Sequence, residues 1–299
     1  MEDEARKTAA DFDPQVLGLY DRYVHGLMDR RAFLGAVGSL LGTAAAAGVL
    51  AALTPRFAQA QQVAADDPRL HATREDFDSP SGHGKVQGYL VAPAKGAGSA
   101  PRVLVIHENR GLNPHIEDVT RRMALAGFVA FAPDALSPLG GYPGEEDAAR
   151  ALFGQLDQAK SRADFEAAAH WLLARPGGKG KFGAVGFCWG GAMVNHLATR
   201  MPQLAAGVPF YGVAPELDQV PGIRAELLVV LAADDERVNA TWPGYRQALD
   251  AAKVRYSLYQ PEGTVHGFHN DTTPRYDQAA AREAWTRTLA LFERQLRSA

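Results

Sequence analysis

The sequence predicts an α/β fold in which a mostly parallel β-sheet is covered by helices on both faces. From about residue 86 onward, short apolar runs alternate with longer segments of helical periodicity. The apolar runs are continuous and rich in Val, Ala and Phe, as is typical of strands buried on both faces. Strands that alternate with helices are joined by crossover connections, so most of them should run parallel.

The first predicted strand covers residues 102–107 and reads Arg-Val-Leu-Val-Ile-His. Further strands are expected at residues 128–132, 182–187, 205–211, 226–232 and 255–259. Helices are expected at residues 116–126, 145–156, 161–173, 190–200, 245–252 and 277–297. No linker divides the chain after the N-terminal segment, so we expect a single domain over residues 61–299.

Composition limits the possible functions. The chain has 299 residues, of which 46% are hydrophobic, which is enough for a large core. Its net charge of -3 gives no electrostatic footprint for nucleic acid, so no nucleic-acid partner is expected. The single cysteine, Cys188, excludes an intramolecular disulfide and a multi-cysteine zinc site. A lone cysteine is usually a small core residue, so a chemical role for it needs support from its surroundings.

Residues 1–60 have the features of an N-terminal extension with a targeting signal. Arg30 and Arg31 precede Phe-Leu, and residues 32–55 carry no charge. This pattern resembles a twin-arginine export signal, and Ala58-Gln-Ala60 is a small-x-small cleavage pattern. We therefore expect a periplasmic or secreted protein that uses the twin-arginine export machinery and meets the membrane only through this segment.

An uncleaved signal that anchors the chain in the membrane is the alternative. The length of the apolar run permits a span, but Ala and Gly provide little transfer free energy. The role of residues 1–27 stays open, as does the question of whether Met28 is the true start.

Cys188 lies in the pattern Gly186-Phe-Cys188-Trp-Gly190, between a predicted strand and a predicted helix. A Gly-x-nucleophile-x-Gly motif in that context is typical of a nucleophile on a tight, strained turn. The glycines let the two backbones approach closely. The N-terminus of the following helix favours the thiolate and offers N–H groups to an oxyanion.

Two other motifs resemble cofactor-binding sites, but neither has the required context. Residues 178–183 match the dinucleotide pattern Gly-x-Gly-x-x-Gly, but they precede a strand instead of following one and are better interpreted as a flexible turn. His266 and His269 have the spacing of a metal pair, but no third ligand accompanies them. We expect neither a metal nor an organic cofactor.

A thiol nucleophile needs a base and an acid that orients the base, in the chain order nucleophile, acid, histidine. Asp235 follows one predicted strand and His266 follows the next, as this order requires. Asp234 and His269 are the alternatives; the Asp-x-x-Val spacing favours Asp235, and Gly267 favours a tight loop at His266.

Glu108 follows the first predicted strand, within the sequence His-Glu-Asn-Arg-Gly at residues 107–111. The second N–H of an oxyanion hole normally comes from this strand-to-loop junction. A carboxylate there could hold or deprotonate the thiol, although a surface acid in a turn is the simpler interpretation.

Together, Glu108, the Cys188 elbow, Asp235-x-x-Val and His266-Gly-Phe resemble the dienelactone hydrolase (carboxymethylenebutenolidase) family, over roughly residues 76–296. The resemblance implies an α/β-hydrolase fold with Cys188 as nucleophile, His266 as base and Asp235 as its orienting acid. It further implies that Glu108 activates the thiol when substrate binds. Backbone N–H groups of Asn109 and Trp189 would form the oxyanion hole.

The resemblance is weaker for the substrate. Family members that act on dienelactone grip its carboxylate with arginines, one of them four residues after the histidine, where this chain has Asn270. Residues 134–144 also lack arginine, which leaves Arg110 and Tyr142 as candidate substrate contacts. We expect hydrolysis of a small-molecule ester or lactone through an acyl-enzyme. The alternatives are a thioesterase or peptidase, or a non-catalytic periplasmic binding or redox protein.

Overall fold

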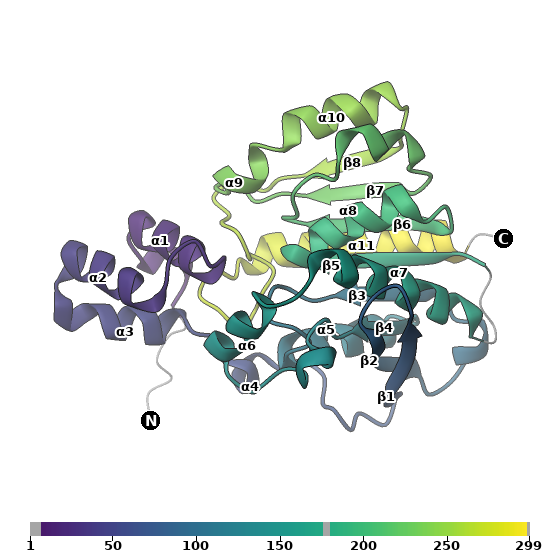
Figure 1. Ribbon diagram of the computed structural model, residues 1–299, viewed down its shortest axis with the longest axis horizontal. Coiled ribbons are helices and arrows are strands. Elements are labelled where there is room, and N and C mark those ends of the chain that lie inside the picture. The colour runs from purple at the N-terminus through teal and green to yellow at the C-terminus, as the bar shows by residue number, and fades with distance from the viewer. Residues whose placement is uncertain (1–6, 176–179, 298–299) are drawn as a thin grey trace.

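The computed structural model describes residues 7–175 and 180–297 (Figure 1). The turn expected at residues 178–183 therefore lies partly outside the described residues. The eight strands form one sheet in the order β1-β2-β4-β3-β5-β6-β7-β8. The strands are β1 (Leu70–Ser79), β2 (Gly84–Pro93), β3 (Arg102–Ile106), β4 (Val129–Pro133), β5 (Phe182–Phe187), β6 (Leu204–Phe210), β7 (Glu226–Val230) and β8 (Tyr256–Tyr259). From β4 to β8 all neighbours pair in parallel, which confirms the predicted fold class.

Except for the short helix α9, which was not predicted, the helices that cover the sheet follow the predicted order with small shifts at their ends. They are α5 (Pro114–Leu125), α6 (Glu146–Phe153), α7 (Gln158–Ala174), α8 (Trp189–Arg200), α9 (Glu236–Asn239), α10 (Trp242–Ala251) and α11 (Gln278–Arg297). Capping explains several starts: the side chain of Asn113 accepts from the N–H of Ile116, and that of Asp235 accepts from the N–H of Val238.

The antiparallel hairpin of β1 and β2 is absent from the sequence-based prediction. β1 is an edge strand that pairs with β2 alone, and β2 pairs antiparallel with β4. Most side chains of β1 are exposed, so the strand lacks the alternating apolar pattern by which strands are predicted.

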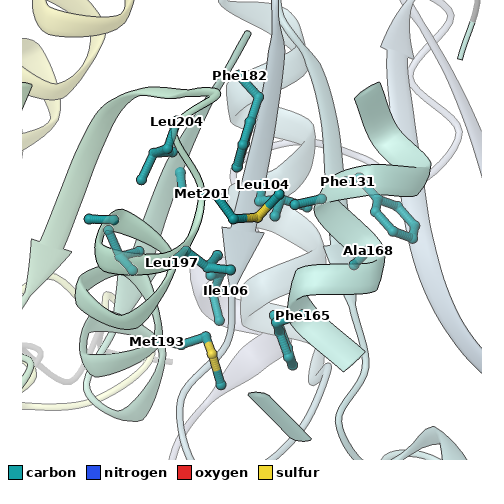
Figure 2. Packing of buried hydrophobic residues seen from close by; sticks show 14 of the residues in the cluster. Leu104, Ile106, Phe131, Phe165, Ala168, Phe182, Met193, Leu197, Met201 and Leu204 are labelled. Atoms are coloured by element: carbon teal, nitrogen blue, oxygen red, sulfur yellow. The ribbon is translucent and has the colours of Figure 1, made fainter. Parts of the chain in front are cut away.

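Two apolar layers, one on each face of the sheet, hold this part of the molecule together. Successive side chains of a strand point to opposite faces. Accordingly Leu104 and Ile106 of β3 pack with α6, α7, α8 and α10, whereas Val103 and Val105 pack with α5 and α11. Figure 2 shows the first layer, where Phe165 from α7 and Met193 from α8 meet the β3 side chains.

Residues 7–60 fold into a helical unit outside the sheet, which we call the cover. Its helices are α1 (Pro14–Val24), α2 (Arg30–Leu41), α3 (Thr43–Leu53) and α4 (Phe57–Ala60). The first three share a small core that includes Tyr20, Phe33 and Leu50, and they lie at one end of the molecule (Figure 1). Within the described part of the chain, no helix combines the length and apolar character needed to cross a membrane.

Candidate active site

Cys188 occupies a strained turn between β5 and α8. Its φ is 57° and its ψ is -113°, a conformation that L-residues rarely adopt. The turn is tight because a Cβ at Gly186 would lie 2.1 Å from the carbonyl oxygen of Gly190. A Cβ at Gly190 would lie 2.4 Å from the carbonyl oxygen of Ile106. Both positions therefore require glycine, and the sulfur is held at the N-terminus of α8.

His266 and Asp235 form a buried pair. Nδ1 of His266 lies 2.6 Å from Oδ2 of Asp235, and both side chains are at most 5% exposed. Asp234 is exposed and contacts this region through its backbone, in a bridge to Val265. Of the two neighbouring aspartates, the structure therefore brings Asp235 to the imidazole.

The alternative histidine, His269, lies in a different environment. Its ring stacks on Phe187 with centroids 5.0 Å apart, and it also contacts Phe210 and Trp285. Burial lowers the pKa of His269 to about 3, so the ring is neutral at physiological pH. A ring nitrogen of His266, in contrast, lies within 4.8 Å of the Cys188 sulfur.

Charges around Cys188 favour an ion pair with His266. Burial by itself raises the pKa of the Cys188 thiol, but the neighbouring imidazoles of His25 and His266 lower it to about 5. Burial likewise disfavours the charged form of His266, but the Cys188 sulfur and the hydrogen bond to Asp235 raise its pKa to about 10. Between these values the site holds a thiolate and an imidazolium.

The second imidazole, His25, comes from the cover. Its Nε2 lies 3.3 Å from Sγ of Cys188, and its ring meets the His266 ring edge-on with centroids 4.6 Å apart. Nδ1 of His25 lies 2.7 Å from the carbonyl oxygen of Asp21. Sequence reasoning missed His25 because the role of residues 1–27 stays open at the level of sequence, and no motif there marks a chemical role.

The cover also binds the loop after β3. The carbonyl oxygen of Val24 accepts from Nδ2 of Asn109 at 2.9 Å and from Nη2 of Arg110 at 3.1 Å. The cavity left at Cys188 has a volume of about 30 Å³, enough for one or two water molecules. Thirteen residues line it, namely Tyr20, Val24, His25, Pro55, Glu108, Asn109, Arg110, Glu146, Cys188, His266, Asn270, Thr273 and Arg275. With the cover docked, little space remains beside the sulfur.

Of the other predicted site residues, some line this cavity and some contact its lining residues. Glu108 lines it, and its Oε2 accepts a hydrogen bond from Nδ2 of Asn270 at 3.0 Å. Trp189 begins α8 directly after Cys188, and its indole N–H donates to Gln158 at 2.9 Å. Tyr142 donates to Oε1 of Glu146 at 2.9 Å and so stands behind a lining residue.

Arg275 is a cavity residue that sequence reasoning missed. Its side chain is buried, and its Nε and Nη1 make no hydrogen bond within the described part of the molecule. The guanidinium lies over the Tyr20 ring of the cover, 5.2 Å from its centroid. Arg275 follows the position of Asn270 by five residues, in a loop whose sequence has no periodicity to show which side chains point inward. Two buried donors without partners make this a suitable place for an anion.

A wider groove of about 1320 Å³ lies between the cover and the loops around α9. His266, Asp235 and Arg275 line it, so it reaches the catalytic candidates from their outer side. Nη2 of Arg237, which also lines the groove, lies 3.0 Å from Nε2 of His25. His25 therefore contacts the groove through Arg237 and the small cavity through Cys188.

Known proteins resemble both parts of the chain. Residues 86–296 match the family model described as dienelactone hydrolase family, and residues 3–39 match one described as YqhI-like. A "Putative carboxymethylenebutenolidase" of Synechocystis is 31% identical over 236 residues, which cover 73% of this chain and 95% of that protein. A "Putative hydrolase fragment YghX" of Escherichia coli is 56% identical over 105 residues, 35% of this chain and 90% of the fragment.

A solved structure is also similar to this chain. The "Putative Dienelactone Hydrolase" of Klebsiella pneumoniae has 28% sequence identity and a TM-score of 0.64, and the match covers 74% of this chain and 98% of that one. The family match spans most of the sheet and all the elements that carry Cys188, Asp235 and His266. The resemblance inferred from the motifs is thus confirmed: this chain is a hydrolase that belongs to the dienelactone hydrolase family.

Proposed function

We propose that the protein hydrolyses a carboxylic ester or lactone through an acyl-enzyme on Cys188. The observation that supports this most strongly is the thiol at a strained strand-to-helix turn, beside an imidazole that Asp235 holds at 2.6 Å. The lowered pKa of Cys188, about 5, supplies the thiolate that nucleophilic attack requires.

The reaction has two steps. The Cys188 thiolate attacks the carbonyl carbon, and the electron pair moves to the carbonyl oxygen, which receives N–H donors from Asn109 and Trp189. The intermediate then expels the alcohol oxygen, which takes the proton of the His266 imidazolium. Water, deprotonated by neutral His266, attacks the thioester carbon and releases the acid, which restores the thiolate and the imidazolium. With a lactone, the alcohol remains attached to the acid.

Glu108 is proposed to keep Cys188 deprotonated: if the imidazolium returns its proton to the sulfur as substrate binds, the Glu108 carboxylate accepts that proton. It lines the cavity that contains the sulfur, and Asn270 fixes its carboxylate. A second proton acceptor would keep the sulfur reactive whichever way His266 turns.

The substrate is proposed to carry a carboxylate. Arg275 lines the cavity and has two buried donors without partners among the described residues, and Arg110 lines the same space. A carboxylate would supply the acceptors that these guanidinium groups need. In this proposal Arg275 takes the role of the arginine that dienelactone-cleaving family members have where this chain has Asn270.

In the uncleaved chain, substrate access is proposed to require movement of the cover. The cavity of about 30 Å³ leaves little room for an ester, whereas the groove of about 1320 Å³ next to it is large enough. His25 contacts residues of both spaces, so displacement of its ring would connect them.

A substrate panel tests the proposal. We expect kcat/KM to be highest for esters and lactones that carry a carboxylate, lower for thioesters and unmeasurable for peptides. Cys188→Ala and Cys188→Ser should lose turnover while they keep the circular dichroism of the wild type. Full activity in both variants would contradict Cys188 as the nucleophile. A preference for thioesters or peptides would show that the protein is a thioesterase or a peptidase instead. The absence of turnover on every substrate would favour the non-catalytic binding or redox protein.

Export through the twin-arginine machinery is proposed on the basis of Arg30-Arg31 and the uncharged run of residues 32–55. Cleavage after Ala60 would remove all four helices of the cover, including His25. Cell fractionation with N-terminal mass analysis tests this: we expect periplasmic protein that begins at Gln61. A cytoplasmic chain that retains residue 30 would contradict export, and a membrane-bound chain would indicate the uncleaved anchor.

A further inference from the structure

Three potential metal ligands meet at the junction of the cover and the hydrolase domain. The ligand atoms of His25, Cys188 and His266 all lie within 4.8 Å of one another, and Nε2 of His25 is 3.3 Å from the sulfur. In a tetrahedral zinc site, bond lengths of about 2.3 Å to sulfur and 2.05 Å to nitrogen place the two atoms about 3.5 Å apart. The distance between His25 and the sulfur is therefore close to what one ion would require, and the third ligand atom lies within 4.8 Å of both.

Both imidazoles are oriented as metal-binding histidines are. Nδ1 of His266 is held by the carboxylate of Asp235 at 2.6 Å. Nδ1 of His25 is held by Asp21, by the carbonyl oxygen at 2.7 Å and by Oδ1 at 3.2 Å. A carboxylate or carbonyl on one ring nitrogen leaves the other nitrogen as the ligand and raises its basicity. Each histidine thus has its second nitrogen available on the side of the sulfur.

The available atom of His266 is the one that faces the sulfur. Its Nε2 is buried, in a residue that is 5% exposed. In the metal-free protein this nitrogen carries the imidazolium proton opposite the Cys188 thiolate. A zinc ion would replace that proton and take the same nitrogen and sulfur as ligands.

We propose that His25, Cys188 and His266 bind a zinc ion that joins the cover to the hydrolase domain and withholds the nucleophile. A thiolate with two imidazoles is a ligand set suited to zinc. The cavity beside the sulfur has room for the water that would complete a tetrahedron. Binding would release the His266 proton to solvent, because only the neutral ring can act as a ligand.

One side chain has to move for the ion to bind. Nη2 of Arg237 lies 3.0 Å from Nε2 of His25, and a guanidinium cannot stay there beside a cation. Arg237 is exposed and lies on the short helix α9, so its side chain can turn into the groove. The acidic groups Asp21 and Asp235, behind the two rings, offset the charge of the ion.

The proposed site has a consequence that separates it from the hydrolytic function. Two ligands come from the hydrolase domain and one from the cover, so the complete site exists only in the uncleaved chain with the cover docked. Zinc should therefore inhibit hydrolysis reversibly, and a chelator should restore it. Metal binding itself can be measured without any substrate, so a failed hydrolytic proposal would leave this one testable.

The test uses tag-free, full-length protein treated with a chelator, dialysed and kept reduced. Titration with Co²⁺ should give a saturable thiolate-to-cobalt charge-transfer band at one ion per chain, and Zn²⁺ should displace the cobalt. Cys188→Ser should abolish the band. His25→Ala should weaken zinc binding by about 100-fold or more in competition with a chromophoric chelator, since it removes one of three ligands. His170→Ala, which changes an exposed histidine on α7, should bind zinc as the wild type does.

Hydrogen exchange supplies the second readout. Zinc should slow exchange in α1 of the wild type and leave the rate unchanged in Cys188→Ser. The proposal is wrong if the wild type gives no saturable band. It is equally wrong if His25→Ala binds zinc as tightly as the wild type, because the ion would then be held without the cover.

Discussion

Nε2 of His25 lies 3.3 Å from Sγ of Cys188, although 163 positions separate the two residues in the sequence. This contact places a side chain of the cover directly against the sulfur, and it adds a second imidazole to the pair formed by Cys188 and His266. The cover thus influences both access to the nucleophile and its charge.

Replacing His25 should open the site. His25→Ala removes the contacts with Cys188 and Arg237, and each hydrogen bond lost contributes about 0.5–1.5 kcal/mol to the docked state. We expect kcat/KM for an ester to rise about tenfold, measured with a chelator present so that metal release plays no part. His170→Ala should leave kcat/KM unchanged. A decrease in the His25 variant with an intact fold would show that His25 takes part in the chemistry.

Thiol reactivity should follow the lowered pKa of Cys188. The thiolate is the reactive form, so alkylation by iodoacetamide should remain fast down to about pH 5 and slow below it as the sulfur is protonated. An ordinary thiol would lose reactivity below about pH 8.5. Because the two imidazoles cause the shift, His25→Ala should move the midpoint to higher pH. A wild-type midpoint at the ordinary thiol value would exclude the ion pair.

Asp235 should be needed to align the imidazole. Asp235→Asn should lower kcat by about 10³- to 10⁴-fold, because an amide favours the wrong tautomer of the ring. Asp234→Asn is a matched control: its side chain is exposed, and its activity should stay near that of the wild type. Steady-state kinetics on the best ester of the panel distinguish the two. Equal losses in both variants would contradict the assignment.

Arg275 should govern recognition of a substrate carboxylate. Arg275→Gln removes the charge of a buried guanidinium whose Nε and Nη1 lack partners. Hydrogen bonds to charged groups contribute about 1.5–3 kcal/mol, so KM for a carboxylate-bearing ester should rise about 10- to 100-fold. The methyl-capped form of the same substrate is the control, and its KM should change little. A parallel change in both substrates would indicate a structural role for Arg275.

Much of the fold and part of the candidate site could be predicted from the sequence. The buried strands and covering helices follow from their periodicity, and the Cys188 elbow follows from two glycines whose Cβ atoms would collide with neighbouring backbone. The β1–β2 hairpin was not predicted because most side chains of β1 are exposed and polar. His25 and Arg275 were not predicted as site residues for another reason. Their roles arise from long-range packing of a helical cover and an aperiodic loop, which local sequence patterns do not encode.

The covalent intermediate is the most direct test of the central claim. Wild-type protein mixed briefly with an activated acetyl ester, quenched in acid and measured by intact mass should carry one acetyl group, which peptide mapping should place on Cys188. In His266→Ala the adduct should form more slowly and persist, because deacylation lacks its base. Cys188→Ala should gain no mass. A wild type that never acquires the acyl group, or a Cys188→Ala variant that acquires it equally, would contradict the proposed mechanism.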